Sequence, residues 1–379
     1  MMSSKKFITS LLKKADVEIN GSRDWDIEVH DERFYRRLLH SGTLGLGESY
    51  MDGWWDVKSL DTYIERCLKA NLSAELESQP LLAIYLAGYT FLGKTFNKQN
   101  IRRAFQVAEK HYDIGNELYV RMLDSNMQYS CGYWKDAKTL EEAQLAKMDL
   151  ICKKVQLTKG MRVLDIGCGW GGLSDYMARN YGVDVVGITV SKEQAKLASG
   201  RTKDLSVNIL VEDYRLLNEG EFDRIVSVGM FEHVGYRNYR EFIVQVKKLL
   251  TDDGLFLLHT IGSNYTSYTG DPWVEKYIFP NGMLPSIAQV GRSIDDLLVM
   301  EDWQNFGPDY EKTLMAWYEN FRIAWPALKH SGKFDRRFYR MWKYYLLSMA
   351  GAFRSRRNNQ LWQIVLSKNG VPGGYTSER

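Results

Sequence analysis

The segment VGMFEHVG, residues 228–235, places a carboxylate and an imidazole side by side, as Glu232 and His233. It ends an apolar run, FDRIVSVGM, of the kind that forms a buried strand, and His259 ends a similar run in GLFLLHTIG. Because the carboxyl ends of parallel strands meet at one edge of a sheet, we expect Glu232 and His259 to lie together there. Such a pair can take part in proton transfer. The alternative is that Glu232 is an acidic residue at a helix N-terminus, favoured by the helix dipole. His233 is expected to be a structural or rim residue outside the site.

A glycine-rich motif, VLDIGCGWGG, occupies residues 163–172 and holds Gly167, Gly169 and Gly172 in a G-x-G-x-x-G pattern. Glycine lets the backbone turn sharply there and lets a ligand come into contact with it. Enzymes that use NAD and enzymes that use S-adenosylmethionine (SAM) both carry this motif. Asp165 lies two residues before the first of these glycines, where a carboxylate disfavours a pyrophosphate but suits the sulfonium-bearing amino acid SAM. The second strand ends in GITV, without the acidic residue that an NAD ribose needs. The motif therefore favours SAM over NAD, with a merely tight strand-to-helix turn as the structural alternative.

The elements that position these residues are short apolar runs that alternate with amphipathic segments from residue 161 onward. The expected strands are MRVLDIG, VDVVGITV, SVNILVED, FDRIVSVGM, GLFLLHTIG and, at the end of the chain, QLWQIVLSK. Ser191 is a good N-cap for the helix that follows the second strand, with Gln194 at its third position. Strands and helices at this spacing predict an α/β fold with a doubly wound, mostly parallel sheet.

The chain divides by pattern into two domains. Residues 1–100 are predicted to form an N-terminal helical domain, and residues 101–379 the catalytic domain. Within the second domain, residues 262–300 are expected to be a long irregular insertion, and they hold three of the seven prolines. Long irregular insertions in compact domains are usually functional, which suggests that this one shapes the substrate pocket.

Composition excludes several classes of protein. The 379 residues are 45% hydrophobic and 26% charged, as in a globular protein with an ample core, and a net charge of +3 is too small to indicate nucleic-acid binding. The four cysteines form no CxxC pair, which favours a reducing compartment. The first 20 residues lack the long apolar region and cleavage site of a signal peptide. The longest apolar stretch, LLAIYLAGYTFLG, is shorter than the ~20 residues that a membrane-spanning helix needs. We therefore expect a protein that does not cross a membrane.

Eight strings in the chain together resemble the cyclopropane-fatty-acyl-phospholipid synthases. They run in family order from about residue 40 to the C-terminus, and the set is specific even though the glycine motif is not. The strings are GLGESYMDGWW, EKHYDIGN, MQYSCGYW, VLDIGCGWGG, DRIVSVGMFEHVG, LLHTIGS, KYIFPNG and TLMAWYE. The resemblance implies a class I SAM-methyltransferase (Rossmann-like) fold with an added N-terminal helical domain.

The resemblance also implies a reaction. That family transfers the methylene carbon of SAM to the cis double bond of an unsaturated acyl chain in a membrane phospholipid. The alkene attacks the methyl group and becomes a carbocation, and a base then removes a proton from the new methyl group so that the ring closes. Water has to be excluded, and aromatic faces can stabilise the cation without reacting with it. The 11 Trp, 23 Tyr and 15 Phe residues are a suitable supply.

In that family the base is a bound bicarbonate, and the resemblance implies which residues hold it here. They are Cys131, Glu232, His259, the backbone amide of Ile261, and Tyr310, with Glu301 behind them to orient the set. Cys131 is equally well explained as a small core residue, so its part is expected to be steric or through its backbone. No metal ion is implied.

The resemblance implies a second set of residues for SAM. It comprises Tyr129, Ser130, Asp165, Gly167, Gly169, Thr189, Gln194, Asp213 and Tyr214. One position departs from the family pattern, because Met349 stands where many members have a cysteine, so a covalent thiol mechanism at that helix is unavailable.

The partner implied by this function is the surface of a membrane that contains unsaturated phospholipids. Lys5, Lys6, Lys13 and Lys14 would meet anionic headgroups, while the apolar stretch around residues 81–91 would help an acyl chain to leave the bilayer. We expect a cytoplasmic enzyme, associated peripherally with the inner face of the membrane, and a homodimer. Two alternatives remain open: a SAM-dependent N- or C-methyltransferase for a smaller substrate, and a non-catalytic lipid-binding protein.

Overall fold

The computed structural model describes residues 3–95, 97, 99 and 115–379. The chain forms two compact units. The first, here called the helical unit, comprises residues 1–97, 268–282 and 314–359. The second, the sheet unit, comprises residues 98–267, 283–313 and 360–379.

Helices dominate the helical unit, which has only one two-stranded sheet among its described residues, β1–β2. Its elements are α1 (Ser4–Lys14), β1 (Glu28–Val29), α2 (Arg33–Met51), β2 (Trp55–Asp56), α3 (Leu60–Lys69), α4 (Leu72–Glu77), α5 (Pro80–Thr95), α12 (Pro272–Tyr277) and α15 (Arg336–Ser355), with most of α14 (Pro308–His330). As predicted, α1 buries an apolar face, formed by Ile8, Leu11 and Leu12. The long helix α15 packs against α2 and α3. Nothing but glycine fits at position 351, because a Cβ atom there would lie 2.2 Å from the backbone oxygen of Asp61.

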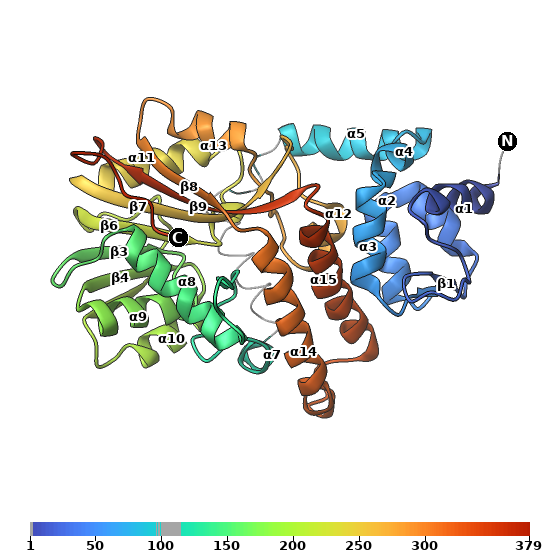
Figure 1. The fold of residues 1–379 in the computed structure, drawn as a ribbon, viewed down its shortest axis with the longest axis horizontal. Coiled ribbons are helices and arrows are strands. Elements are labelled where there is room, and N and C mark those ends of the chain that lie inside the picture. Colours follow the sequence, from blue (N-terminus) through green and yellow to red (C-terminus); the bar gives the residue numbers. More distant parts are fainter. Residues whose placement is uncertain (1–2, 96, 98, 100–114) are drawn as a thin grey trace. The chain divides into compact units, whose positions relative to one another are not determined.

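The sheet unit has a seven-stranded sheet in the order β5-β4-β3-β6-β7-β9-β8 (Figure 1). Its elements are α7 (Asn116–Met122), α8 (Leu140–Lys154), β3 (Arg162–Ile166), α9 (Gly172–Tyr181), β4 (Asp184–Thr189), α10 (Lys192–Arg201), β5 (Val207–Val211), β6 (Phe222–Val228), the 3₁₀ turn η1 (Phe231–His233), α11 (Tyr239–Leu249), β7 (Leu250–Ser263), α13 (Ile287–Ile294), β8 (Val299–Asn305) and β9 (Asn359–Ser367). The five strands from β3 to β7 are parallel, so their carboxyl ends share one edge. Chain order reverses direction between β3 and β6, and ligands of doubly wound sheets bind beside such a point.

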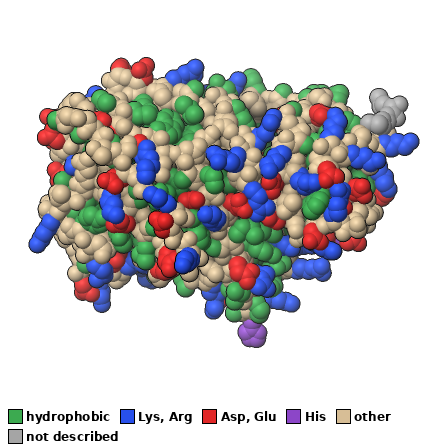
Figure 2. Space-filling view, in the orientation of Figure 1, with side chains coloured by type: hydrophobic (Ala, Val, Ile, Leu, Met, Phe, Trp, Pro, Cys, Tyr) green, Lys and Arg blue, Asp and Glu red, His purple; other side chains and the backbone are tan. Residues whose placement is uncertain are grey.

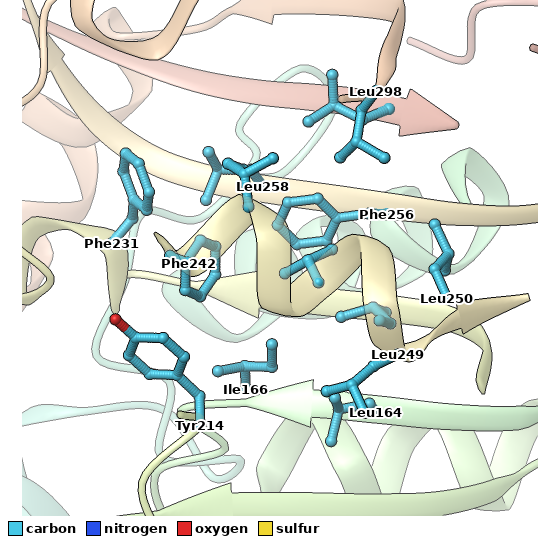
Figure 3. Close-up of a cluster of buried hydrophobic side chains, with 14 of the residues drawn as sticks. Leu164, Ile166, Tyr214, Phe231, Phe242, Leu249, Leu250, Phe256, Leu258 and Leu298 are labelled. Atoms are coloured by element: carbon cyan, nitrogen blue, oxygen red, sulfur yellow. The ribbon is translucent and has the colours of Figure 1, made fainter. Parts of the chain in front are cut away.

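Both faces of this sheet are covered, which explains why its strands are continuous apolar runs. One face packs against α11 and α13, and the other against α8 and α9. Figure 3 shows the first cluster, in which Phe231 of η1, Phe242 of α11 and Leu258 of β7 converge. Successive strand residues alternate between the two clusters: Val163 belongs to one and Leu164 to the other.

The predicted α/β class and mostly parallel sheet are confirmed, and Ser191 caps α10 through the amide of Gln194, as expected. The division by contacts differs from the predicted domains, because residues 268–282 and 314–359 group with the N-terminal part. The predicted irregular insertion contains two helices. Asp271 and Pro272 begin α12, and a Ser286–Gln289 capping box begins α13. Strand β8 was not predicted, since its sequence, VMEDWQN, is mostly polar.

No helix in the described ranges is both long and apolar enough to cross a membrane. On the face shown in Figure 2, basic and acidic side chains are interspersed rather than separated into fields of one sign.

Candidate active site

The glycine motif lies directly after β3, at the point where the chain order reverses. At Gly169, where φ is +57°, a Cβ atom would meet nothing within 4 Å, so the backbone there faces open space. Gly172 is different, because a Cβ atom there would lie 1.9 Å from the backbone oxygen of Asn126. The third glycine of the motif therefore makes room for the backbone of a neighbouring loop, while Gly169 leaves room for a ligand.

Asp165 is completely buried under the motif, where its carboxylate accepts a hydrogen bond of 2.8 Å from the Ser174 hydroxyl. Burial raises the pKa of this carboxyl to about 6. The structure thus fixes Asp165 against the first turn of α9, where it holds the shape of the motif.

Two residues predicted to flank the SAM ribose lie together at the end of β4. The Thr189 hydroxyl is 2.9 Å from the Gln194 side-chain oxygen, and both residues are buried. After β5, Asp213 forms a close ion pair with Arg215, at 2.7 Å. Tyr214 departs from the prediction. Its ring packs edge-on against Phe242, with 5.1 Å between ring centroids, and belongs to the core shown in Figure 3.

The aromatic loop MQYSCGYW, residues 127–134, is joined to the glycine motif by a row of rings. Tyr129 packs against Tyr119 of α7, with centroids 5.2 Å apart, and Tyr119 packs against Trp170 at 4.9 Å. Trp170 lies inside the motif and donates a hydrogen bond to Asn116. The predicted SAM contacts of the loop are therefore held next to the glycines.

A buried lysine that the sequence analysis did not single out holds the same loop. Lys147 of α8 is fully buried, and its ammonium group donates hydrogen bonds to the side chains of Gln128 and Ser130. It forms no ion pair within the described part of the chain, and burial lowers its pKa to about 8. One turn earlier, Gln144 donates to the Ser130 carbonyl oxygen, at 2.8 Å. A positive charge buried without a carboxylate partner favours an anionic ligand nearby.

Glu232 lies on η1, directly after β6, and reaches across to the end of β7. Its Oε1 atom accepts a hydrogen bond of 2.7 Å from the backbone amide of Ile261. His259 lies two residues earlier on β7 and is directly paired with Val228 of β6. The pairing of these two strands thus brings Glu232, His259 and Ile261 together, as predicted. The amide of Ile261, however, is bonded to Glu232 and is not free to bind an anion itself.

Burial disfavours the charged form of both titratable groups of this cluster. The pKa of Glu232 rises to about 7, although the amide of Ile261 and the hydroxyl of Thr260 oppose the shift. The pKa of His259 falls well below its ordinary value, because burial and the charges of Lys147 and Lys154 all disfavour the imidazolium. Among the described residues, neither Glu232 Oε2 nor His259 Nε2 has a hydrogen-bond partner, although both atoms are buried. A carboxyl oxygen and a ring nitrogen therefore remain for a ligand.

The other ring nitrogen of His259 has a partner. Its Nδ1 atom is 3.3 Å from the side-chain nitrogen of Gln363 on β9, and both side chains are buried. Gln363 was also missed by the sequence analysis. Its signal was an amide between apolar residues, in LWQIV of the strand NQLWQIVLS.

Cys131 and Tyr310 form a second group, at the first turns of α14. The Cys131 thiol lies 3.9 Å from the Thr313 hydroxyl, which is one helical turn beyond Tyr310. The same hydroxyl accepts hydrogen bonds from the amide of Gly132 and the indole of Trp134. Burial raises the pKa of the Cys131 thiol well above its ordinary value, so the thiol is uncharged. That its part is steric or through its backbone stays a prediction.

Two aromatic rings connect the groups. The ring of Phe306 packs edge-on against the imidazole of His259, with centroids 5.8 Å apart, and Tyr133 packs edge-on against Phe306 at 5.4 Å. Phe306 precedes α14 and Tyr133 follows Cys131 in the chain, so the ring contacts join His259 to the segments that carry Cys131 and Tyr310.

Glu301 does not join either group, contrary to the prediction. Its carboxylate accepts hydrogen bonds from the Ser367 hydroxyl and the amide of Val371, at 2.6 and 2.9 Å. Ser367 pairs with the first residue of β8, whereas Gln363, the partner of His259, pairs with Gln304 farther along that strand. The sequence placed Glu301 close to Tyr310, but an extended strand carries it to the other end of the sheet. His233 is partly buried, and burial lowers its pKa to about 4.

Comparison with known proteins matches residues 99–364 to the family of mycolic acid cyclopropane synthetases. The chain belongs to this family. A cyclopropane-fatty-acyl-phospholipid synthase from Escherichia coli K12 is 53% identical over 374 residues, which cover 99% of this chain and 96% of that protein. A tuberculostearic acid methyltransferase from Mycobacterium tuberculosis is 33% identical and covers 89% of this chain and 82% of its own length. A crystal structure of a mycolic acid cyclopropane synthase complexed with SAH and CTAB superposes with a TM-score of 0.64 and 31% identity, over 69% of this chain and 98% of that one.

These matches confirm the predicted family, and the predicted enzyme class with it. The cyclopropane synthase fold of this chain carries the glycine motif, the Glu232 cluster and the aromatic loop on one unit.

The two glycines are expected to respond differently to substitution. Gly172→Ala should lower the free energy of unfolding by about 1–3 kcal/mol, because its methyl group would meet backbone that cannot move aside. Gly169→Ala should cost only about 1 kcal/mol from its positive φ but weaken SAM binding at least tenfold. Urea unfolding and calorimetric titration with SAM measure the two effects. Equal loss of SAM affinity and stability in both variants would contradict these separate roles.

Glu232→Gln should make the protein more stable at high pH. Below pH ~4.5 the wild-type carboxyl is protonated in both the folded and the unfolded state. As the pH rises to about 7, the unfolded chain releases this proton and the folded chain retains it, so wild-type stability falls. In bicarbonate-free buffer at pH 8 the variant should be about 3 kcal/mol more stable by urea unfolding. The exposed Glu193→Gln is the matched control, and a difference independent of pH would refute the burial cost.

Proposed function

We propose that this enzyme transfers a methylene group from SAM to the cis double bond of unsaturated acyl chains in membrane phospholipids. Membership of the cyclopropane synthetase family and the 53% identity to the E. coli enzyme support SAM-dependent cyclopropanation of lipids. The observation that carries the finer proposal is the buried pair of atoms, Glu232 Oε2 and His259 Nε2, which lack partners within the described structure.

Bicarbonate fits the chemistry of these two atoms. A neutral imidazole can donate from Nε2 to an anionic oxygen, and Glu232 can accept the hydrogen that bicarbonate carries. The buried charge of Lys147 adds a favourable potential for an anion. When bound, bicarbonate supplies the base that removes a proton from the methylated acyl chain.

The residues of the chain have three tasks in this reaction. Glu232, anchored on the amide of Ile261, fixes the position of the anion and shares its proton. His259 supplies a hydrogen-bond donor without a second positive charge, because its own pKa is lowered by burial. Phe306 and Tyr133 exclude water from the carbocation and offer it the faces of their rings.

Contact with the membrane is proposed for helix α5. The exposed apolar side chains Leu81, Ile84, Phe91 and Leu92 follow one face of this helix, between 51% and 71% exposed. Residues 81–92 contain no charged side chain, and the opposite face packs into the helical unit through Leu82. A row of large apolar groups at the surface suits the acyl boundary of a bilayer. The N-terminal lysines are less available to anionic headgroups, because Lys5 and Lys14 form ion pairs with Glu32 and Glu75.

We further propose that the enzyme is cytoplasmic, associates peripherally with the inner membrane face and forms a homodimer. The net charge of +3 suits an anionic lipid surface.

Incubation with SAM and vesicles of a cis-unsaturated phospholipid should add one CH₂ to the acyl chain, in a product that resists hydrogenation. Mass spectrometry before and after hydrogenation measures it. Glu232→Gln should lower the rate at least ~100-fold, because the anion then loses its acceptor. Removal of dissolved bicarbonate should slow the wild-type enzyme, and its restoration should recover the rate.

A product that hydrogenation converts as an ordinary alkene would instead identify a methyltransferase, the activity named for the M. tuberculosis relative. Activity that is indifferent both to Glu232→Gln and to bicarbonate would refute the proposed base while leaving SAM-dependent alkylation intact. Absence of SAM binding by calorimetry would favour a non-catalytic lipid-binding protein.

Replacing both Ile84 and Phe91 by Asp should weaken binding to phosphatidylglycerol vesicles at least tenfold in a sedimentation assay, since two charges would enter the apolar face. SAM binding should be unchanged. Ile323→Asp is the matched control, because this isoleucine is 65% exposed on a different helix. Equal binding by both variants would exclude α5 as the membrane contact. A dimer in solution that becomes a monomer on the double substitution would assign this face to the subunit interface instead.

A further inference from the structure

Gln363 lies at the centre of β9, which adjoins β7 in the sheet, and its side chain is completely buried. Its amide nitrogen is 3.3 Å from Nδ1 of His259. An amide N–H group can only donate, so a hydrogen bond between these two atoms requires Nδ1 to be the acceptor. In a neutral imidazole, the single hydrogen then has to be on Nε2.

The neighbouring strand β8 carries a second side-chain amide next to Gln363. Gln304 of β8 lies directly opposite Gln363 in the antiparallel pair. The side-chain oxygen of Gln304 accepts a hydrogen bond of 2.6 Å from the ammonium group of Lys154, which is buried and also lies 3.6 Å from Asp302. The Gln304 oxygen is thus engaged by Lys154. The side-chain oxygen of Gln363 is buried and has no hydrogen-bond partner among the described residues, so the Gln363 amide meets His259 through its nitrogen.

We propose that Gln363 is a positioning residue that holds His259 in the tautomer with its hydrogen on Nε2. This inference rests on the proposed function, since it is the anion beside Glu232 that makes use of a donor at Nε2. With the hydrogen on Nδ1, the lone pair of Nε2 would face an anionic ligand and repel it. Gln363 thus acts on the reaction through His259 without touching a substrate.

The tautomer is measured directly by nitrogen NMR of the full-length enzyme labelled with ¹⁵N-histidine. The signals of His259 are those that disappear in His259→Asn. The wild-type protein should show Nε2 protonated and Nδ1 unprotonated. A hydrogen on Nδ1 in the wild-type protein would overturn the proposal, and this measurement does not depend on activity.

Gln363→Leu, which has similar volume but no donor, should let both tautomers form, so that the two nitrogen signals move toward each other. Its KM for bicarbonate should rise about tenfold or more, with the KM for SAM changed less than twofold. Gln363→Glu, which in its ionised form can only accept, should move the hydrogen to Nδ1 at a pH where this carboxyl is ionised, and it serves if the leucine variant does not fold. Gln245→Leu is the matched control, because Gln245 bonds only to the Leu217 carbonyl from α11.

The role of Gln363 and the proposed function of the enzyme can each be refuted without the other. If Gln363→Leu keeps the wild-type tautomer, or keeps the wild-type KM for bicarbonate, the role assigned to Gln363 is refuted while the cyclopropanation assay still stands. If the wild-type enzyme makes no cyclopropane product, the proposed function fails whatever the NMR spectrum shows.

Discussion

The pairing of β6 with β7 is the constraint on which the active site depends. It aligns Val228 with His259, so the turn that follows β6 delivers the carboxylate of Glu232 to the amide of Ile261. One hydrogen bond to a backbone amide does not compensate for full burial of a carboxylate, and the pKa of Glu232 stays near 7 as a result. The fold thus buries a carboxyl group that can gain or lose a proton near neutral pH, in surroundings that exclude water. A reaction through a carbocation needs both properties.

Buried polar contacts in the sheet unit hold the loops that are predicted to bind SAM and the anion. Helix α8 holds the aromatic loop through Gln144 and Lys147, and Thr313 at the start of α14 holds the same loop from its other end. Gly172 admits the backbone of the neighbouring segment, so the glycine motif and the aromatic loop can pack directly against each other. Buried polar contacts of this kind are costly when one partner is lost. They make the geometry of the predicted SAM contacts a property of the folded core.

The sheet unit also buries two lysines, which the sequence analysis did not single out. Lys147 in the middle of α8 and Lys154 at its end are both buried, and both lower the pKa of His259. Lys154 has Asp302 as a counter-charge, whereas the partners of Lys147 are uncharged. Lys147 thus adds a buried positive charge near His259, while the imidazole itself stays neutral. In the proposed reaction this charge would favour the anion without a second cation beside the carbocation.

The sequence by itself determined the α/β class, the six apolar strands, the cap at Ser191 and the family, because periodicity and capping are local and the motifs are contiguous. It also indicated that Glu232 pairs with His259 rather than with its neighbour His233, since parallel strands share an edge. Tertiary structure decided what depends on register and packing. The Tyr214 ring turned into the core, and the polar strand β8 carried Glu301 away from Tyr310. Lys147 and Gln363 are polar residues whose place in their segments does not set them apart, and only the folded unit shows that they face Ser130 and His259.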